Sequence, residues 1–168
     1  MAPQFILIGP PGAGKTTIGR ALANRLQTSF RDTDAIIESE QGKSISSIFL
    51  EDGEDFFRDI EFQTLSKELD LDNGVLALGG GAPLSERAQN LLKNSDADIV
   101  FLDVSLSTAA PRVGFNRDRP LLIGNPRAQW QELLEKRRPI YLQLATLALN
   151  VDDLTVKQIV DLIIEKAR

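Results

Sequence analysis

A chain of 168 residues has the length of one ordinary domain, and its 42% hydrophobic and 26% charged residues are typical of globular rather than disordered proteins. Its net charge of -5 argues against a nucleic-acid partner, which favours a basic face. The absence of cysteine and histidine excludes disulfides, zinc–thiolate sites and cysteine nucleophiles. Any general base must therefore be a carboxylate or the substrate itself, and any metal must have oxygen ligands.

The first predicted element is a strand at Phe5–Ile8, an apolar run too short for a signal peptide or a membrane span. We therefore expect a cytoplasmic protein with no membrane partner, which the absence of cysteine also favours. Similar runs predict strands at residues 75–78, 99–102 and 147–151, with a weaker strand at 29–32. Unbroken apolar runs of this length are typical of strands buried on both faces, as in a parallel sheet.

Helical patterns fill the gaps between these strands. Residues 15–26 place apolar side chains on one face, and a longer pattern at 45–69 contains Gly53 as a break or kink. Asn125 followed by Pro126 indicates a helix start, and Thr155 with Gln158 forms a capping-box pattern. Strands that alternate with helices predict one doubly wound α/β domain over residues 1–168.

A phosphate-binding motif follows the first strand. Gly9-Pro-Pro-Gly-Ala-Gly-Lys15-Thr16 matches G-x-x-x-x-G-K-[ST] in full and opens a predicted helix. Its backbone N–H groups would face one anion, Lys15 would reach the β and γ phosphates, and Thr16 would offer its hydroxyl to Mg²⁺. The alternative is a glycine-rich turn that binds nothing. Because the D-x-x-G and N-K-x-D motifs of GTPases are absent, a small-molecule or nucleotide kinase is the leading class.

Two positions compete for the carboxylate that supports the metal. Asp103 ends the apolar run 99–102, as in a Walker-B pattern, and the pattern alone favours it. Asp32 and Asp34 end the weaker strand and could divide metal support and acceptor binding between them. The alternative for Asp34 is an N-cap on a helix at residues 35–40.

Three features suggest an acidic, hydroxyl-bearing acceptor. Arg58 is one helical turn from Glu54 and from Glu61, which could hold it for a carboxylate or could simply form exposed ion pairs. The glycines at 79–81 follow a strand and suggest close backbone approach to a ligand. Arg137 lies near a helix end, where a cation also complements the helix dipole.

The stretch at residues 111–126 breaks the alternating pattern with several arginines and prolines. Its composition is typical of a surface loop. The sharper interpretation is a mobile, arginine-bearing lid.

Taken together, these motifs identify the chain as resembling the shikimate kinases over nearly its whole length. The resemblance is carried by GPPGAGKTT, the Asp32-Thr-Asp34 pair, GEDFFR with Glu61, the glycine triplet, and the segments that begin at Arg119 and Arg137. It implies a three-layer fold with a five-stranded parallel sheet in the order 2-3-1-4-5, acceptor-binding helices at about 33–62 and a lid at about 111–126. It also implies transfer of the ATP γ-phosphoryl group to shikimate, with Mg²⁺ as the cofactor. We expect the chain to be a monomer.

The resemblance further implies residue roles. The catalytic residues would be Lys15, Asp34 and Arg119, with Asp34 orienting the attacking hydroxyl and Arg119 closing over the phosphates. The metal would be supported by Thr16 and Asp32. This assignment reverses the preference for Asp103 that the sequence pattern alone gave. The expected ATP-binding residues are Gly12, Ala13, Gly14, Lys15, Thr16, Thr17, Arg112 and Arg119. The expected shikimate-binding residues are Asp34, Arg58, Glu61, Gly79, Gly80, Gly81 and Arg137, with apolar walls from Phe49, Phe57 and Pro120.

One segment departs from the family pattern. Residues 150–155, after the last strand, contain neither the Arg nor the Pro that often seats adenine, so backbone contacts would have to replace them. The division of roles between Arg117 and Arg119 stays open. The rival functions are a nucleoside monophosphate or gluconate kinase of the same architecture and, from another class, a nucleotide-binding regulator without catalysis.

Overall fold

The computed structural model describes residues 3–113 and 125–167, and these residues form one α/β unit around a five-stranded sheet. All strand pairs are parallel, and the strand order β2-β3-β1-β4-β5 confirms the predicted order. The strands are β1 (Phe5–Ile8), β2 (Phe30–Asp32), β3 (Val75–Ala77), β4 (Asp98–Asp103) and β5 (Leu147–Asn150). Each therefore lies within two residues of its predicted position at either end.

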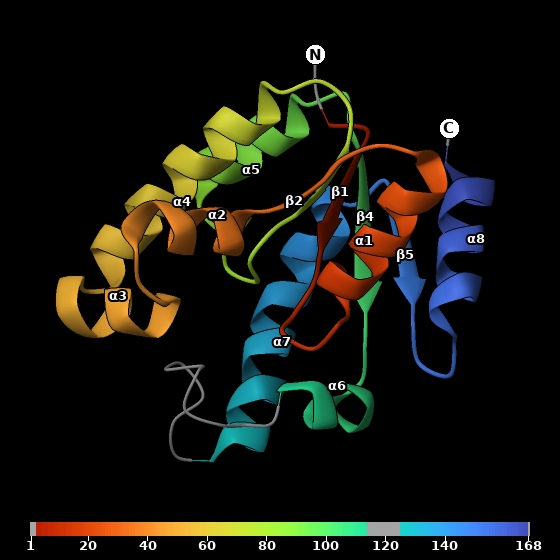
Figure 1. Cartoon of the computed structure of the whole chain (residues 1–168). Coiled ribbons are helices and arrows are strands. Elements are labelled where there is room, and N and C mark those ends of the chain that lie inside the picture. Colours follow the sequence, from red (N-terminus) through yellow and green to blue (C-terminus); the bar gives the residue numbers. More distant parts are fainter. Residues whose placement is uncertain (1–2, 114–124, 168) are drawn as a thin grey trace.

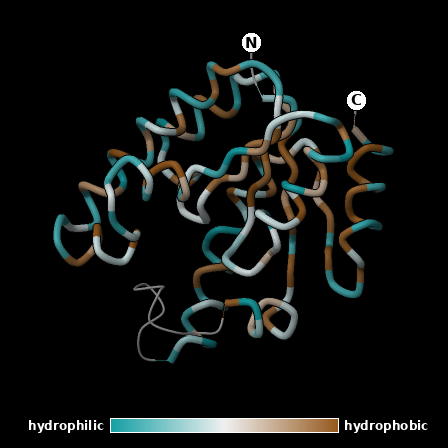
Figure 2. Tube along the Cα trace, in the orientation of Figure 1, coloured by the Kyte–Doolittle hydropathy of each residue, from teal (hydrophilic) through white to brown (hydrophobic). Residues whose placement is uncertain are grey.

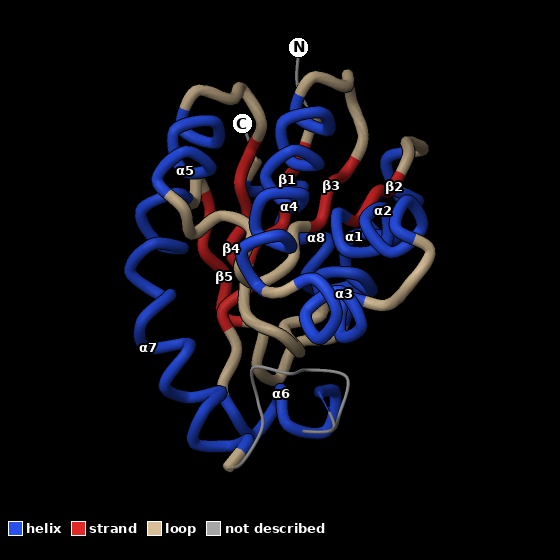
Figure 3. The backbone as a smooth tube through the Cα atoms, turned by 90° about the vertical axis from the view of Figure 1, so that its left-hand side faces the viewer, coloured by secondary structure: helices blue, strands red, loops and turns tan. Residues whose placement is uncertain are grey.

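The described helices connect these strands in chain order (Figure 1). They are α1 (Lys15–Leu26), α2 (Thr33–Gln41), α3 (Ile45–Asp52), α4 (Glu54–Leu69), α5 (Glu86–Lys93), α6 (Leu106–Val113), α7 (Pro126–Leu144) and α8 (Val156–Lys166). Figures 1 and 3 show α1 and α8 on one face of the sheet and α5 and α7 on the other. Helix α4 lies on the same face as α5, and its Leu65 and Leu69 belong to the main core. Helices α2 and α3 pack on α4 and on each other.

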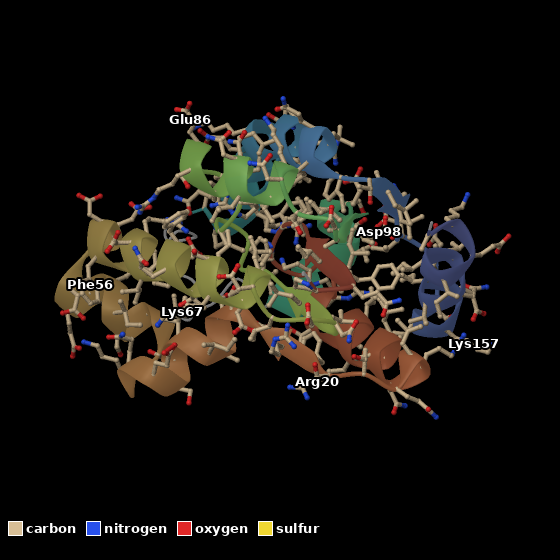
Figure 4. All side chains as sticks on the ribbon, turned by 90° about the horizontal axis from the view of Figure 1, so that it is seen from above. Arg20, Phe56, Lys67, Glu86, Asp98 and Lys157 are labelled. Atoms are coloured by element: carbon tan, nitrogen blue, oxygen red, sulfur yellow. The ribbon has the colours of Figure 1, made fainter. Side chains whose placement is uncertain are left out.

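The main core lies between the sheet and its covering helices. The side chains of β1 are almost completely buried, as are most of those in β3 and β4, which is why these strands are continuous apolar runs. Figure 2 shows hydrophobic colour concentrated on the central strands, and in Figure 4 the labelled ionic side chains Glu86 and Lys157 project outward from their helices. A smaller apolar cluster of Ile37, Ile48 and Phe57 joins α2, α3 and α4.

Several helix boundaries follow their sequence signals. Gly53, with φ of 90°, breaks the pattern at 45–69 into α3 and α4, as predicted. Asn125 caps α7 by accepting from Ala128 N–H, and Thr155 and Gln158 form the complete capping box of α8. None of the described helices is both long and apolar enough to cross a membrane.

Two helices were not predicted, and one of them overlaps the start of the stretch at 111–126. Helix α5 is short and highly polar, and α6 contains Pro111, which in sequence suggests a break. Residues 111–113 belong to α6, and Pro126 begins α7, so both ends of the stretch at 111–126 are helical rather than loop. The middle of that stretch, including Arg117, Arg119 and Pro120, lies outside the described residues.

Candidate active site

The phosphate-binding motif forms the turn between β1 and α1. Gly12 and Gly14 have φ values of 84° and 92°, which residues with a Cβ rarely adopt, so glycine is required at both positions. Gly14 caps α1 without any side-chain hydrogen bond, which leaves the first N–H groups of the helix directed at the space before it. A helix start of this kind, with its partial positive charge, is suited to an anion.

A cavity of about 740 Å³ opens in front of this turn. It lies at the carboxyl ends of the parallel strands, where ligands bind in open α/β sheets. Its wall includes Gly12, Gly14, Lys15, Thr16, Thr17, Asp32, Asp34, Gly79, Gly80 and Arg112. Of the predicted ATP-binding residues that are described, only Ala13 does not line this cavity, because its side chain is buried.

Two basic side chains hold the backbone of the motif. The Lys15 ammonium donates to the Gly9 carbonyl at 2.6 Å and to the Pro10 carbonyl at 3.1 Å. The Arg112 guanidinium donates to the Gly12 carbonyl at 3.1 Å, which links α6 to the phosphate-binding turn. Both cations therefore lie where they can meet an entering polyphosphate.

Asp32 connects the end of β2 with the phosphate-binding turn. Its Oδ2 accepts from the Thr16 hydroxyl at 3.0 Å, and its Oδ1 accepts from Asp34 N–H and Ala35 N–H. Asp32 is thus the N-cap of α2, so the alternative in which Asp34 only caps a helix at residues 35–40 does not hold. The helix begins two residues earlier, which places Asp34 in its first turn with its side chain in the wall of the cavity.

The pairing of Thr16 with Asp32 suits a magnesium site. Among the described residues no three acidic side chains gather as a metal cluster, but Mg²⁺ bound to a nucleotide takes most of its ligands from phosphates and water. One hydroxyl and one carboxylate beside the phosphate-binding turn are therefore sufficient. The competing Asp103 instead pairs with Arg138 at 2.8 Å and does not line the cavity.

The glycines at 79–81 bring three functional side chains against one segment of backbone. A Cβ on Gly79 would lie 2.5 Å from Asp34 Oδ1, and one on Gly80 would lie 3.1 Å from Arg137 Nη1. A Cβ on Gly81 would collide with the guanidinium of Arg58. None of the three has a positive φ, so these glycines are needed for space rather than for backbone conformation.

Arg58 is held by a buried carboxylate. Its Nη1 donates to Glu61 Oε1 at 2.7 Å, and the Glu61 side chain is only 4% exposed. Glu54 lies 3.6 Å from Arg58 but is 55% exposed, so of the two predicted partners Glu61 is the firmer one. Burial raises the pKa of Glu61 to about 7, against the opposing effect of the adjacent Arg58 guanidinium. Arg58 also lies over the rings of Phe49 and Phe57.

Helix α7 supplies two contacts that the sequence did not reveal. Tyr141, which is completely buried, donates its hydroxyl to the Gly80 carbonyl at 2.6 Å. Trp130, also buried, donates its indole N–H to the Pro11 carbonyl at 2.9 Å. These residues share one helix face with Leu134 and Arg137, at the spacing i, i+4, i+7, i+11, which in sequence indicates only a buried face.

Comparisons with known proteins agree with this geometry. The model of the family described as shikimate kinase matches residues 11–168. A shikimate kinase of Thermobifida fusca is 48% identical over 161 residues, which cover 96% of this chain and 92% of that protein.

The chain belongs to the shikimate kinase family.

Solved structures place it in the same family. A shikimate kinase from Acinetobacter baumannii in complex with shikimate has a TM-score of 0.93 and 32% identity, and the match covers 100% of this chain and 96% of that one. A gluconokinase from Sinorhizobium meliloti is 20% identical with a TM-score of 0.58, at 95% and 88% coverage, so it shares the fold alone. The likeness to shikimate kinases is therefore much stronger than the likeness to a kinase of the rival class.

The residues that the family resemblance assigns to the acceptor do not all line one cavity but are divided between two. Asp34, Gly79 and Gly80 line the large cavity, whereas Arg58, Glu61, Gly81 and Arg137 line a second one of about 420 Å³. The glycine segment and the two guanidiniums packed on it form the boundary. All the predicted acceptor residues therefore meet at this boundary, but they do not face a single open space.

Proposed function

We propose that this chain transfers the γ-phosphoryl group of ATP to the 3-hydroxyl of shikimate, giving ADP and shikimate 3-phosphate for aromatic amino-acid biosynthesis. One observation carries the assignment of roles: Asp34, Arg137 and Arg58 each lie against one glycine of the segment 79–81. That segment in turn lies beside the phosphate-binding turn, because a Cβ on Gly80 would be 3.4 Å from Pro11 Cδ. Donor and acceptor groups are therefore adjacent.

The donor nucleotide would occupy the large cavity. Its phosphates would meet the N–H groups at the start of α1 together with Lys15 and Thr16. The base end is supported by Arg112 on one side and by the apolar side chains of Leu154 and Val156, which also line the cavity. These two side chains supply a surface for adenine where the family pattern of Arg and Pro is missing.

The acceptor would lie at the boundary of the two cavities. Its carboxylate is complementary to the guanidiniums of Arg58 and Arg137, which Glu61 and the Gly79–Gly81 backbone hold in place. Its hydroxyls would meet Asp34 and the backbone at Gly80. An acidic, hydroxyl-bearing ring satisfies both ends of this arrangement, whereas a nucleoside monophosphate has no carboxylate for the arginine pair.

The transfer step needs little covalent chemistry from the protein. Asp34 orients the acceptor hydroxyl and accepts its proton as the oxygen bonds to the γ phosphorus, while the bond from phosphorus to the β–γ bridging oxygen breaks. Lys15 neutralises charge on the β and γ phosphates. Mg²⁺, held by Thr16 with support from Asp32, would supply further positive charge there when bound. Arg119, which lies outside the described residues, is proposed to add to this neutralisation from the lid.

We also propose that the chain acts as a monomer in the cytoplasm, where ATP is produced. The proposal of a monomer is supported by the site's completeness within one copy, because Asp34, Arg58 and Arg137 all meet around the glycines at 79–81.

A coupled ADP-release assay across shikimate, gluconate, AMP and CMP tests the proposed function. We expect ADP release that depends on shikimate and on no other acceptor. Release with gluconate or a nucleotide alone would assign the chain to that acceptor instead, and tight ATP binding without turnover on any acceptor would favour a regulator.

Lys15→Ala and Asp34→Ala should each lower turnover by about a hundredfold or more, as Arg119→Ala should also do. Full turnover by Asp34→Ala would remove that carboxylate from the mechanism.

A further inference from the structure

Trp130 is the only tryptophan of the chain, and it lies in the first part of α7 with 1% of its surface exposed. The indole carries a single polar hydrogen, on Nε1, and that hydrogen goes to the Pro11 carbonyl at 2.9 Å. Pro11 belongs to the phosphate-binding turn and lines the large cavity, whereas Trp130 does not. The contact therefore holds the turn from behind, on the side away from the cavity.

The orientation of this carbonyl determines the orientation of an N–H group. The peptide bond between Pro11 and Gly12 is trans, and in a planar trans peptide the C=O and the N–H point in opposite directions. Fixing the Pro11 oxygen on the indole consequently turns the Gly12 N–H away from α7, towards the cavity that Gly12 lines. Arg112 holds the next carbonyl, that of Gly12, so both peptide planes that flank Gly12 are restrained by side chains from other helices.

Gly12 needs such restraint more than most residues would. Its φ of 84° is one that glycine alone adopts readily, and glycine also has the widest choice of alternative conformations. An N–H group that is already oriented binds the phosphates of the nucleotide, or the charge that develops on them during transfer, without first being ordered. A mobile N–H group must be ordered when it binds.

We propose that Trp130 is a positioning residue for the reaction: through the Pro11 carbonyl it aims the Gly12 N–H at the nucleotide phosphates. The proposal rests on the proposed function, because it takes the large cavity to be the nucleotide site. Trp130 acts at the nucleotide end of α7. At the other end of the same face, Tyr141 holds the Gly80 carbonyl beside the acceptor residues. One helix thus orients a backbone group in each half of the active site.

The two contacts provide matched variants. Trp130→Phe deletes one donor to the Pro11 carbonyl, and Tyr141→Phe deletes the donor to the Gly80 carbonyl together with a contact between its oxygen and Arg137. Both variants keep a buried ring on the same helix. Trp130→Phe should weaken ADP binding in calorimetry, and raise KM for ATP, on the order of tenfold, with KM for shikimate changed less than twofold. Tyr141→Phe should do the reverse. Unchanged ADP affinity in Trp130→Phe would overturn the proposal. Equal losses of affinity for ADP and for shikimate, together with a lower Tm, would also overturn it, because a merely structural role of Trp130 would produce that result.

Two further measurements do not depend on the folding of Trp130→Phe. Because the tryptophan is unique, growth of a tryptophan auxotroph on β-(3-benzothienyl)alanine replaces only this side chain by a ring of the same shape without the N–H. The substituted protein should show the same selective loss of ADP affinity, and full affinity would contradict the proposal.

In the unsubstituted protein, the single indole ¹⁵N–¹H resonance should shift when ADP and Mg²⁺ are added and not when shikimate is added. The absence of a shift with ADP would also overturn it. Binding of ADP is measured without an acceptor, so these tests stand even if the chain proves to phosphorylate something other than shikimate.

Discussion

The backbone of Gly79 lies so close to the Asp34 carboxylate that a methyl group cannot fit between them. A Cβ on Gly79 would be 2.5 Å from Asp34 Oδ1 and 3.0 Å from Oδ2, and the Gly79 N–H donates to the buried hydroxyl of Thr33, the residue before Asp34. The carboxylate that we propose as the orienter of the acceptor hydroxyl is therefore positioned by the end of a neighbouring strand.

Gly79→Ala tests this relationship. The added methyl must displace the Asp34 carboxylate, and a misplacement of about 1 Å can lower turnover by roughly a hundredfold. We expect a loss of kcat of that order with nearly unchanged ADP affinity. Gly42→Ala is the matched control: there is open space at this exposed helix end, but φ is 70°, so alanine should lower Tm and leave kcat unchanged. If the two variants lose kcat equally, the close approach to Asp34 has no functional meaning.

The sequence was sufficient to predict β1, β3 and β4, because these buried strands are continuous apolar runs and the phosphate-binding motif follows the first of them. Strands β2 and β5 are less buried, and the strand order came from the family resemblance. The sequence also predicted the break at Gly53 and the capping residues of α7 and α8, since those signals are local. It could not indicate why three glycines follow β3. Each glycine makes room for a side chain from a distant part of the chain, and such spacing becomes visible only when Asp34, Arg58 and Arg137 are placed around them.

The same limit applies to the carboxylates and to α7. Asp32 and Asp34 are both plausible caps in sequence, and only the position of the first helical turn separates them. Trp130 and Tyr141 are indistinguishable in sequence from ordinary core residues, because a buried aromatic residue in an amphipathic helix needs no other explanation. The partners of their polar atoms are backbone carbonyls more than 60 residues away, which no pattern in the sequence identifies.

Asp32→Asn and Asp103→Asn separate the two candidates for metal support. Asparagine also caps helices well, so Asp32→Asn should keep α2 while it weakens the support that Thr16 gives to Mg²⁺. We expect the Mg²⁺ concentration for half-maximal activity to rise by about ten- to a hundredfold. Asp103→Asn loses only a partly exposed ion pair with Arg138, and its Mg²⁺ dependence should match that of the unmodified chain. If instead Asp103→Asn raises the Mg²⁺ requirement and Asp32→Asn does not, the carboxylate that supports the metal is Asp103, at the end of β4.

Arg58→Ala should act chiefly on the acceptor. It removes a guanidinium proposed to bind the shikimate carboxylate, and a charge-assisted hydrogen bond of this kind is worth about 1.5–3 kcal/mol, or roughly ten- to a hundredfold in KM for shikimate. KM for ATP should change less than twofold. Arg87→Ala is the control, because Arg87 lines the same second cavity but pairs with Asp59 where both side chains are about half exposed. A comparable rise in KM for shikimate in the control would mean that general positive charge, not Arg58, binds the acceptor.

Glu61 predicts a pH dependence of stability with a defined sign. Burial raises its pKa from the model-compound value of 4.5 to about 7, so between these values the folded chain binds this proton more firmly than the unfolded chain. The free energy of unfolding should therefore fall as the pH rises from about 4.5 to 7, by at most about 1.4 kcal/mol per pH unit from this group. Denaturant titrations at several pH values measure the slope, and Glu61→Gln, which cannot ionise, should remove its share.

Glu54→Gln is the control for that slope. Glu54 lies on the same helix and also approaches Arg58, but its side chain is more than half exposed, so its loss should leave the slope unchanged. The ionised form of Glu61 is the one that holds Arg58, so KM for shikimate should rise as the pH falls below about 7 in the unmodified chain and in Glu54→Gln. In Glu61→Gln the same KM should be higher at neutral pH and nearly flat across this range. If KM for shikimate rises equally at low pH with and without Glu61, the titrating group lies elsewhere, and the buried carboxylate is only a structural partner of Arg58.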